Sequence, residues 1–311
     1  MSYKKPSTPE EKAAAREYSE QKIKGLKQTI TDTLDDLAAA LAEGRSEAFL
    51  NFMTFAARFH RYSSNNQLLI MAQAPNAEFV AGFHTWQAQG RRVKKGAKGI
   101  AIMRPLMVTD HEAAPLENGR QPQKMGGYKY VHVFADYDTE GDPIPDYMTV
   151  QGSEQTHAQL LTLTEQARAA GVPVEYRACA PGVYGLSDGG RIVLDSVKCA
   201  DEPGTATRTF FHEWAHHVMH WQAQGKRAED APESRQLREL EADAAAYALC
   251  SLHGVDARAQ VADYVSGWGG NPEALKASVQ RITRAVTAIM QTLRPEPDEQ
   301  ERPAAKGRRA A

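Results

Sequence analysis

The chain has 311 residues, of which 42% are hydrophobic and 24% charged, and its formal net charge is −2. These values are typical of a globular protein long enough for two domains. No apolar run approaches the roughly 20 residues of a membrane span, and no apolar core follows the N-terminal lysines, so we expect a cytoplasmic protein without membrane association. Three cysteines without a CxxC pair argue against a disulfide framework or a cysteine-based zinc site.

Three helices are predicted in the first quarter of the chain, after about eight disordered residues. Residues 9–43 carry apolar side chains at helical spacing and are followed by Gly44, and residues 47–60 place three phenylalanines on one face. A third helix begins after "YSSNN", where Ser63 or Ser64 can cap it, and stops at Pro75.

β-Rich segments follow these helices. They are "EFVAGF", "IAIMRPLMV" and "YKYVHVF", and "KKGAKG" between the first two is expected to form a hairpin turn. The polar stretch "DTEGDPIPDYMTVQGS" marks a boundary, so we expect domains at 1–148 and 149–293 and a disordered tail at 294–311. The second domain is predicted to contain a helix at 153–169, strands near "VPVEYR" and "GRIVLDS", a histidine-bearing helix, and two or three further helices.

The histidine-bearing segment "RTFFHEWAHHVMHW" contains the motif H-E-x-x-H. Histidines four apart on a helix project in nearly the same direction, so His212 and His216 can bind one metal ion while Glu213 faces its open side. His220 is on the same face, but one more turn of the helix places it about 6 Å further from His212, too far for the three histidines to converge on one ion. His217 and His220 are therefore expected to be neighbours of the site rather than ligands.

A catalytic zinc site needs three protein ligands and an exchangeable water, so a third ligand is expected. After the motif no glycine occurs before Gly225, which excludes the metzincin arrangement, in which a glycine breaks the helix ahead of a third histidine. The segment "SRQLRELEADAAAYALCSLHG" offers Glu239, with Asp243 one turn further on to accept the N–H of a ligand histidine. Glu241 is rotated by about 200° from Glu239 and is the alternative ligand.

These residues predict metal-assisted hydrolysis of a peptide bond. A His₂Glu site suits Zn²⁺, with Mn²⁺ or Co²⁺ as alternatives. Glu213 is the predicted general base, which takes a proton from water and passes it to the leaving amine. Candidate oxyanion donors are Tyr247, His217 and Tyr264, and the strand "GRIVLDS" is a candidate edge for an extended peptide.

The stretch from Asn51 to Arg104 has eight basic residues against one acid, a net +7, and aromatic residues lie among them. Cations beside phosphates and rings that stack on bases are what sequence-tolerant binding of single-stranded DNA requires. Phe52, Phe55 and Phe59 are instead expected in the core. The candidate DNA-binding residues are Arg58, Arg61, Tyr62, Trp86, Arg91, Arg92, Lys94, Lys95 and Lys98.

The order of residues in this region closely resembles a known family. "YSSNNQLLIMAQAPNAEFVAGFHTWQAQGRRVKKGAKGIAIMRPL", followed by "VFADYDTEGDPIP", resembles the N-terminal single-stranded-DNA-binding domain of the ArdC antirestriction proteins of conjugative plasmids, over about residues 45–145. The second half is similar to the zincin-like metallopeptidase domain of that family, and the resemblance also places the third ligand on Glu239. Many relatives continue the zinc motif with a Trp-Thr-Gly-like segment, whereas "HEWAHHVMHW" is more similar to ImmA/IrrE-type proteases.

The resemblance implies an α+β protein, in which an α+β DNA-binding domain precedes a mostly helical zincin-like domain with a small antiparallel sheet. It implies a monomeric, gluzincin-like metallopeptidase that binds single-stranded DNA, acts on an unidentified protein substrate and protects incoming plasmid DNA from host restriction. Two alternatives remain open. The protein either protects DNA by occupancy alone, with a non-catalytic metal site, or it is a regulatory protease of ImmA/IrrE type that cleaves a repressor.

Overall fold

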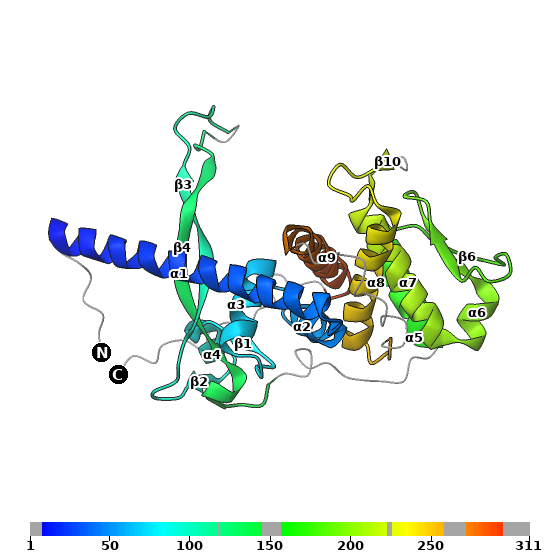
Figure 1. Ribbon diagram of the computed structural model, residues 1–311, viewed down its shortest axis with the longest axis horizontal. Helices are drawn as coiled ribbons and strands as arrows, with labels where there is room; N and C mark the ends of the chain where they lie inside the picture. Colours follow the sequence, from blue (N-terminus) through cyan, green and yellow to red (C-terminus); the bar gives the residue numbers. More distant parts are fainter. Residues whose placement is uncertain (1–7, 117–118, 145–156, 223–225, 258–271, 295–311) are drawn as a thin grey trace. The chain divides into compact units, whose positions relative to one another are not determined.

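The computed structural model describes residues 8–116, 119–144, 157–222, 226–257 and 272–294 (Figure 1). The chain forms two compact units, and each is described by itself. The first unit comprises Met1–Thr33 and Leu68–Asp142, and the second comprises Leu34–Gln67 and Pro143–Ala311. The predicted boundary at residue 148 lies outside the described residues. So do the predicted disordered ends, apart from Thr8 and Arg294. The predicted division into 1–148 and 149–293 stays a prediction; the compact units differ from it by grouping 34–67 with the C-terminal residues.

Three helices open the chain, close to their predicted positions. They are α1 (Pro9–Ala42), α2 (Ser46–Arg58) and α3 (Ser64–Gln73). The C-terminal half of α1 buries apolar residues at helical spacing, and Gly44 follows the helix with a φ of 80°, a left-handed conformation that favours glycine. None of the described helices is long and apolar enough to cross a membrane.

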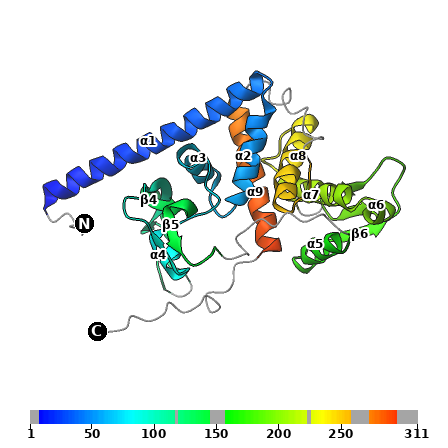
Figure 2. The same cartoon turned by 90° about the horizontal axis from the view of Figure 1, so that it is seen from below.

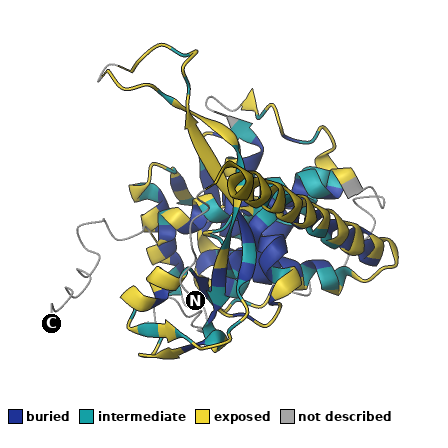
Figure 3. Ribbon diagram, turned by 90° about the vertical axis from the view of Figure 1, so that its left-hand side faces the viewer, coloured by how far each residue is buried: buried dark blue, intermediate teal, exposed yellow. Residues whose placement is uncertain are grey.

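The first unit contains short strands and one long hairpin. Its further elements are β1 (Val80–Ala81), α4 (Phe83–Ala88), β2 (Arg91–Val93), β3 (Ile100–Thr109), β4 (Gln123–Ala135), a 3₁₀ turn η1 (Asp136–Asp138) and β5 (Thr139–Gly141). They form the antiparallel sheets β1-β4-β3 and β2-β5. The outer part of the β3–β4 hairpin is exposed on both strands (Figure 3).

The predicted hairpin turn at Lys94–Gly99 is wrong. This turn connects β2 to β3, but the two strands lie in different sheets. β2 pairs instead with β5, from Arg91 opposite Gly141 to Val93 opposite Thr139. Gly141 permits this pairing, because its φ is 135° and a Cβ atom there would lie 2.4 Å from the carbonyl oxygen of Gly90.

The second unit is mostly helical. Its elements after α2 are α5 (His157–Ala169), β6 (Val174–Arg177), β7 (Gly185–Ser187), β8 (Ile192–Asp195), α6 (Ser196–Asp201), α7 (Pro203–Met219), β9 (Trp221–Gln222), β10 (Lys226–Arg227), α8 (Arg235–Leu252) and α9 (Pro272–Leu293). α2 packs against α8 and α9, as Figure 2 shows, and α7 packs against α8. The predicted α+β class is confirmed.

A small three-stranded sheet lies beside α7 in the second unit. Its order is β6-β8-β7, with β6 parallel and β7 antiparallel to the central strand β8. All four residues of β8 are buried, which explains its continuous apolar sequence "IVL". Both α7 and the sheet therefore share one core, in which Phe210, Phe211 and Trp214 are fully enclosed.

Candidate metal centre and nucleic-acid interface

Helix α7 presents the H-E-x-x-H motif on the face opposite its buried side. Pro203 occupies the first turn, where its missing N–H costs nothing. Phe210, Phe211 and Trp214 are buried in the core, whereas His212, Glu213 and His216 remain partly accessible. The apolar spacing of the helix thus fixes which side chains face the candidate site.

Helix α8 brings two carboxylates to this face. The hydroxyl of Ser234 caps the helix by accepting the N–H of Leu237 at 3.3 Å. A run of buried alanines gives α8 a small surface where it contacts α7. Glu239 and Asp243, one turn apart, therefore both reach the histidines of α7.

His212, His216 and Glu239 converge in one triangle of donor atoms. The two Nε2 atoms lie 3.1 Å apart, and Glu239 Oε2 lies 3.4 Å from that of His212 and 3.3 Å from that of His216. Tetrahedral zinc with bonds of about 2.0–2.1 Å places its ligand atoms about 3.3 Å from one another. The donor set and its spacing therefore fit a divalent ion of this size.

Asp243 holds the ring of His212. Its Oδ1 lies 2.8 Å from His212 Nδ1 and also accepts a hydrogen bond of 2.8 Å from Arg208 Nη2. Burial lowers the pKa of His212, but the hydrogen bonds to Asp243 and Glu239 outweigh it and raise this pKa to about 9. The same histidines hold the pKa of Glu239 far below its ordinary value.

The alternative ligand Glu241 is engaged elsewhere. It is fully buried, and its carboxylate lies 3.2 Å from His220 Nε2 and accepts hydrogen bonds from Arg281 and Ser278. Burial raises the pKa of Glu241, yet these three donors hold it below the ordinary value. His220 Nδ1 in turn lies 2.8 Å from His216 Nδ1. The structure therefore brings Glu239, and not Glu241, to the two Nε2 atoms.

Glu213 lies against strand β7. It accepts a hydrogen bond from the backbone N–H of Ser187, and burial raises the pKa of its carboxyl. Two buried polar atoms of this region, Ser187 Oγ and His217 Nδ1, have no hydrogen-bond partner among the described residues. Ser187 was missed by sequence reasoning because no motif marks it.

The structure revises two expectations from the sequence, one about the strand edge that could bind a peptide and one about the oxyanion donors. The strand within "GRIVLDS" is β8, which is paired on both sides, so it has no edge for a peptide; the edge beside α7 belongs to β7. Among the candidate oxyanion donors, Tyr247 is buried on α8, His217 is partly exposed beside the candidate ligand His216, and Tyr264 lies outside the described residues.

The structure separates the candidate DNA-binding residues into structural and exposed ones. Trp86 is 1% exposed, and its indole N–H donates to the carbonyl of Phe134 at 2.9 Å, so its ring cannot stack on a base. Arg91 packs against that indole and bonds Thr139 and the carbonyl of Asp142. Trp86 is therefore a core residue, and the half-buried Arg91 fastens β2 to β5.

The exposed candidates form a basic patch on β2 and the turn after it, consisting of Arg92, Lys94, Lys95 and Lys98. Arg92 pairs with Glu140 while 81% of its side chain is exposed, and Lys94 Nζ donates to the carbonyl of Tyr137 at 2.8 Å. Lys95 and Lys98 form no ion pair with any described residue.

Tyr137 of η1 adds an exposed aromatic ring to this patch and was missed by sequence reasoning. It is 48% exposed. The flanking acids Asp136 and Asp138 made the segment read as acidic, but Asp136 is a structural acceptor for the N–H groups of Glu78 and Phe79. Because Tyr137 stands between two aspartates, the sequence here did not indicate a surface that binds nucleic acid.

A second group of exposed cations lies on the hairpin. Arg104 of β3 is directly opposite Lys129 of β4, and neither forms an ion pair with another described residue. Like charges directly opposite each other repel and destabilise a sheet. An anion bound between them would relieve this repulsion. Arg58, Arg61 and Tyr62 belong to the second unit; burial raises the pKa of Tyr62 to about 12.

Comparisons with known proteins agree with this architecture. Residues 20–134 match the family model of the N-terminal domain of anti-restriction factor ArdC. The metal-free crystal structure of the antirestriction protein ArdC from the R388 plasmid is similar over 85% of this chain and 97% of its own, with a TM-score of 0.50 and 15% identity. Its Mn(II)-bound structure covers 86% of this chain and 99% of its own, with a TM-score of 0.46 and 13% identity.

One curated relative is the uncharacterized protein pXO2-81 of Bacillus anthracis, which is 22% identical over 89% of this chain and 53% of its own length. The chain therefore spans about half the length of the curated relative that it matches. The family model matches residues 20–134, and the metal-free crystal structure of ArdC is similar in fold to the chain. On these two grounds, residues 20–134 form a domain similar to the N-terminal domain of ArdC, and the chain has a fold similar to that of ArdC.

Proposed function

We propose that this protein is an antirestriction factor that combines single-stranded-DNA binding with a metallopeptidase site. The observation that carries the enzymatic half is the triangle of His212, His216 and Glu239, whose donor atoms are 3.1–3.4 Å apart, with Glu213 in the next position on α7. A purely structural metal site has no use for a carboxylate such as Glu213. The membership of residues 20–134 in an antirestriction family supports the biological role.

The residues around the triangle suit hydrolysis of a peptide. A divalent ion, most suitably Zn²⁺ and alternatively Mn²⁺ or Co²⁺, supplies Lewis-acid chemistry that acidifies water and polarises a carbonyl. Glu213 takes a proton from water and passes it to the leaving amine, a role that its raised pKa favours. The edge of β7 pairs with the extended substrate, and Ser187 and His217 are candidates to hold its carbonyl oxygen.

The basic patch and Tyr137 support the nucleic-acid half of the proposal. Four exposed cations track a phosphate backbone, and an exposed ring beside them provides a stacking surface for one base. The opposed cations Arg104 and Lys129 offer a further phosphate contact. Single-stranded DNA satisfies both requirements, because its bases are accessible for stacking.

A substitution of Glu213 tests the enzymatic half. Protection of incoming plasmid DNA is measured in cells expressing wild type, Glu213→Gln, a Lys94→Gln/Lys95→Gln variant, or Glu233→Gln, which changes a carboxylate that is 94% exposed. We expect Glu213→Gln to bind metal like wild type but to lose hydrolysis and protection, and Glu233→Gln to keep both. Full protection by Glu213→Gln, with loss in the lysine variant, would instead support protection by DNA occupancy alone.

Salt dependence tests the nucleic-acid half. Binding of a fluorescent oligothymidylate is measured by anisotropy at several salt concentrations for wild type and for Lys94→Gln/Lys95→Gln/Lys98→Gln. Each lost phosphate contact on a single strand lowers the slope of log affinity against log salt by about 0.7. Lys226→Gln, an exposed lysine of the second unit, is the matched control. A slope that the triple substitution leaves unchanged would contradict the assignment of this patch.

A further inference from the structure

The two histidines of the candidate metal centre are held differently at their Nδ1 atoms. His212 faces the carboxylate of Asp243, whereas His216 faces the imidazole of His220 at 2.8 Å. A carboxylate can only accept a hydrogen bond, but two neutral imidazoles must divide the roles of donor and acceptor between them. The role of His216 Nδ1 therefore depends on the proton of His220.

The surroundings of His220 decide which ring donates. Its Nε2 lies 3.2 Å from Glu241 Oε2, and a carboxylate there requires a proton on that nitrogen. The Nδ1 of a neutral His220 is then an acceptor, so His216 Nδ1 must carry the donated proton. The lone pair of His216 is left on Nε2, the atom that belongs to the triangle with His212 and Glu239.

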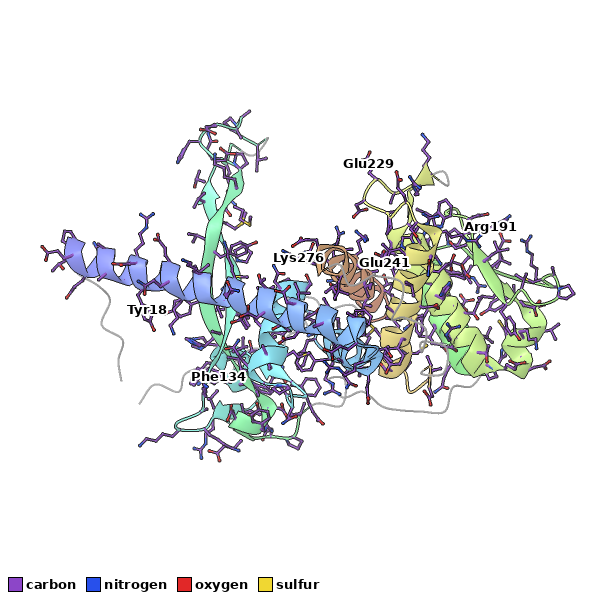
Figure 4. The ribbon with its side chains drawn as sticks, in the orientation of Figure 1. Tyr18, Phe134, Arg191, Glu229, Glu241 and Lys276 are labelled. Atoms are coloured by element: carbon purple, nitrogen blue, oxygen red, sulfur yellow. The ribbon has the colours of Figure 1, made fainter. Side chains whose placement is uncertain are left out.

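Glu241 lies at the far end of the series of contacts that runs from His216 through His220. Ser278 Oγ donates to its Oε1 at 2.6 Å, and Arg281 Nε lies 3.1 and 3.0 Å from its two oxygens. Glu241 is fully buried between α8 and α9, and Figure 4 labels it there. A buried carboxylate with several donors is held in one place, so the arrangement links α7, α8 and α9.

We propose that His220 and Glu241 form a buried relay that fixes the tautomer and orientation of His216 for metal binding. His220 and Glu241 are positioning residues, and Ser278 and Arg281 anchor them. The proposal rests on the proposed metal site, because its consequence is the affinity of His216 Nε2 for the ion. Partners of this kind, one contact away from the ion, typically contribute 10–100-fold to metal affinity. The relay also gives Glu241 a defined role that differs from direct ligation.

Zinc affinity tests the proposal with three substitutions. His220→Phe keeps an aromatic ring but removes the acceptor, whereas the amide oxygen of His220→Asn can still accept the N–H of His216. His253→Phe is the matched control, since His253 is a histidine of the same unit that lies 2.8 Å from the carbonyl of Leu249, outside the relay. Dissociation constants for Zn²⁺ are measured by competition with a chromophoric chelator. We expect His220→Phe to weaken binding by about 10–100-fold, His220→Asn to recover most of the loss, and His253→Phe to bind like wild type.

The ring protons of His216 provide a second readout that needs no metal. Proton–nitrogen correlation spectra of the metal-free protein are expected to show a hydrogen-bonded Nδ1–H on His216, which His220→Phe abolishes and His253→Phe retains. Equal zinc affinity in wild type and His220→Phe, an equal loss in His253→Phe, or absence of this proton from wild type would overturn the relay. A wild type that binds no zinc but shows the proton would overturn the proposed metal site and leave the relay as the account of the histidine geometry.

Discussion

Asp243 Oδ1 lies 2.8 Å from Nδ1 of His212, on the side of the ring opposite the Nε2 that belongs to the candidate metal triangle. This contact fixes the ring and makes Nε2 more basic, so Asp243→Asn is expected to weaken zinc binding by about 10–100-fold without unfolding the protein. Chelator competition measures the dissociation constant, and Asp201→Asn, a change at an exposed carboxylate, is the control. An unchanged dissociation constant in Asp243→Asn would remove this residue from the site.

The stability of the metal-free protein is expected to fall between about pH 6.5 and pH 9. The pKa of His212 is raised to about 9 in the folded chain, so its protonated form stabilises the fold fully below pH 6.5 and progressively less as pH rises through 9. The loss is on the order of 3 kcal/mol. Urea unfolding in the presence of EDTA across this range measures it. In Asp243→Asn the pH dependence should shrink, and an equally steep dependence there would contradict the assignment.

Trp86 and Tyr137 are expected to fail in opposite ways when changed to alanine. Loss of the buried indole costs about 3–5 kcal/mol of unfolding free energy, because it leaves a cavity and an unpaired carbonyl at Phe134. Loss of the exposed ring of Tyr137 changes stability by less than about 0.5 kcal/mol but weakens oligonucleotide binding by about 1–3 kcal/mol. Urea unfolding and anisotropy on both variants separate the two roles. A stable Trp86→Ala that binds DNA poorly would restore Trp86 to the interface.

Gly141→Ala is expected to destabilise the β2–β5 pair more than Gly127→Ala destabilises the hairpin. Both glycines have φ close to +135°, but a Cβ atom at Gly141 would meet the carbonyl of Gly90 at 2.4 Å, whereas nothing lies within 4 Å at Gly127. The shared backbone strain costs about 1–3 kcal/mol in each variant, and the collision adds to it only at Gly141. Thermal unfolding of the two variants measures the difference; equal losses would mean that the strands separate readily.

Helical periodicity predicted much of this fold, because it is a local property. The spacing of apolar residues gave α1 nearly its full extent, and the same geometry separated Glu239 from Glu241 by their direction around α8. Strand pairing was not predictable in this way. The partner of Arg92 on β5 lies 48 residues away, and nothing near "KKGAKG" shows that β2 and β3 belong to different sheets.

Burial was the second property that the sequence did not disclose. Trp86 belongs to a basic and aromatic stretch that resembles a binding surface, yet it is buried and its indole N–H donates to a backbone carbonyl inside the first unit. His220 shows the same difficulty within the second unit. Its place four residues after His216 was evident, but its role depends on Glu241 and on α9, whose contacts no motif records.

The edge of β7 is only three residues long. At about 3.3 Å per residue it spans roughly 10 Å, which is enough to align one scissile bond but too little to bind a peptide tightly through backbone pairing. Under the proposed function, such an enzyme selects its target by encounter frequency rather than by a long recognition sequence. A strand of DNA bound by the same chain raises the local concentration of any protein that travels along that strand. If the proposed function holds, the shortness of β7 makes the nucleic acid a determinant of which proteins are cut.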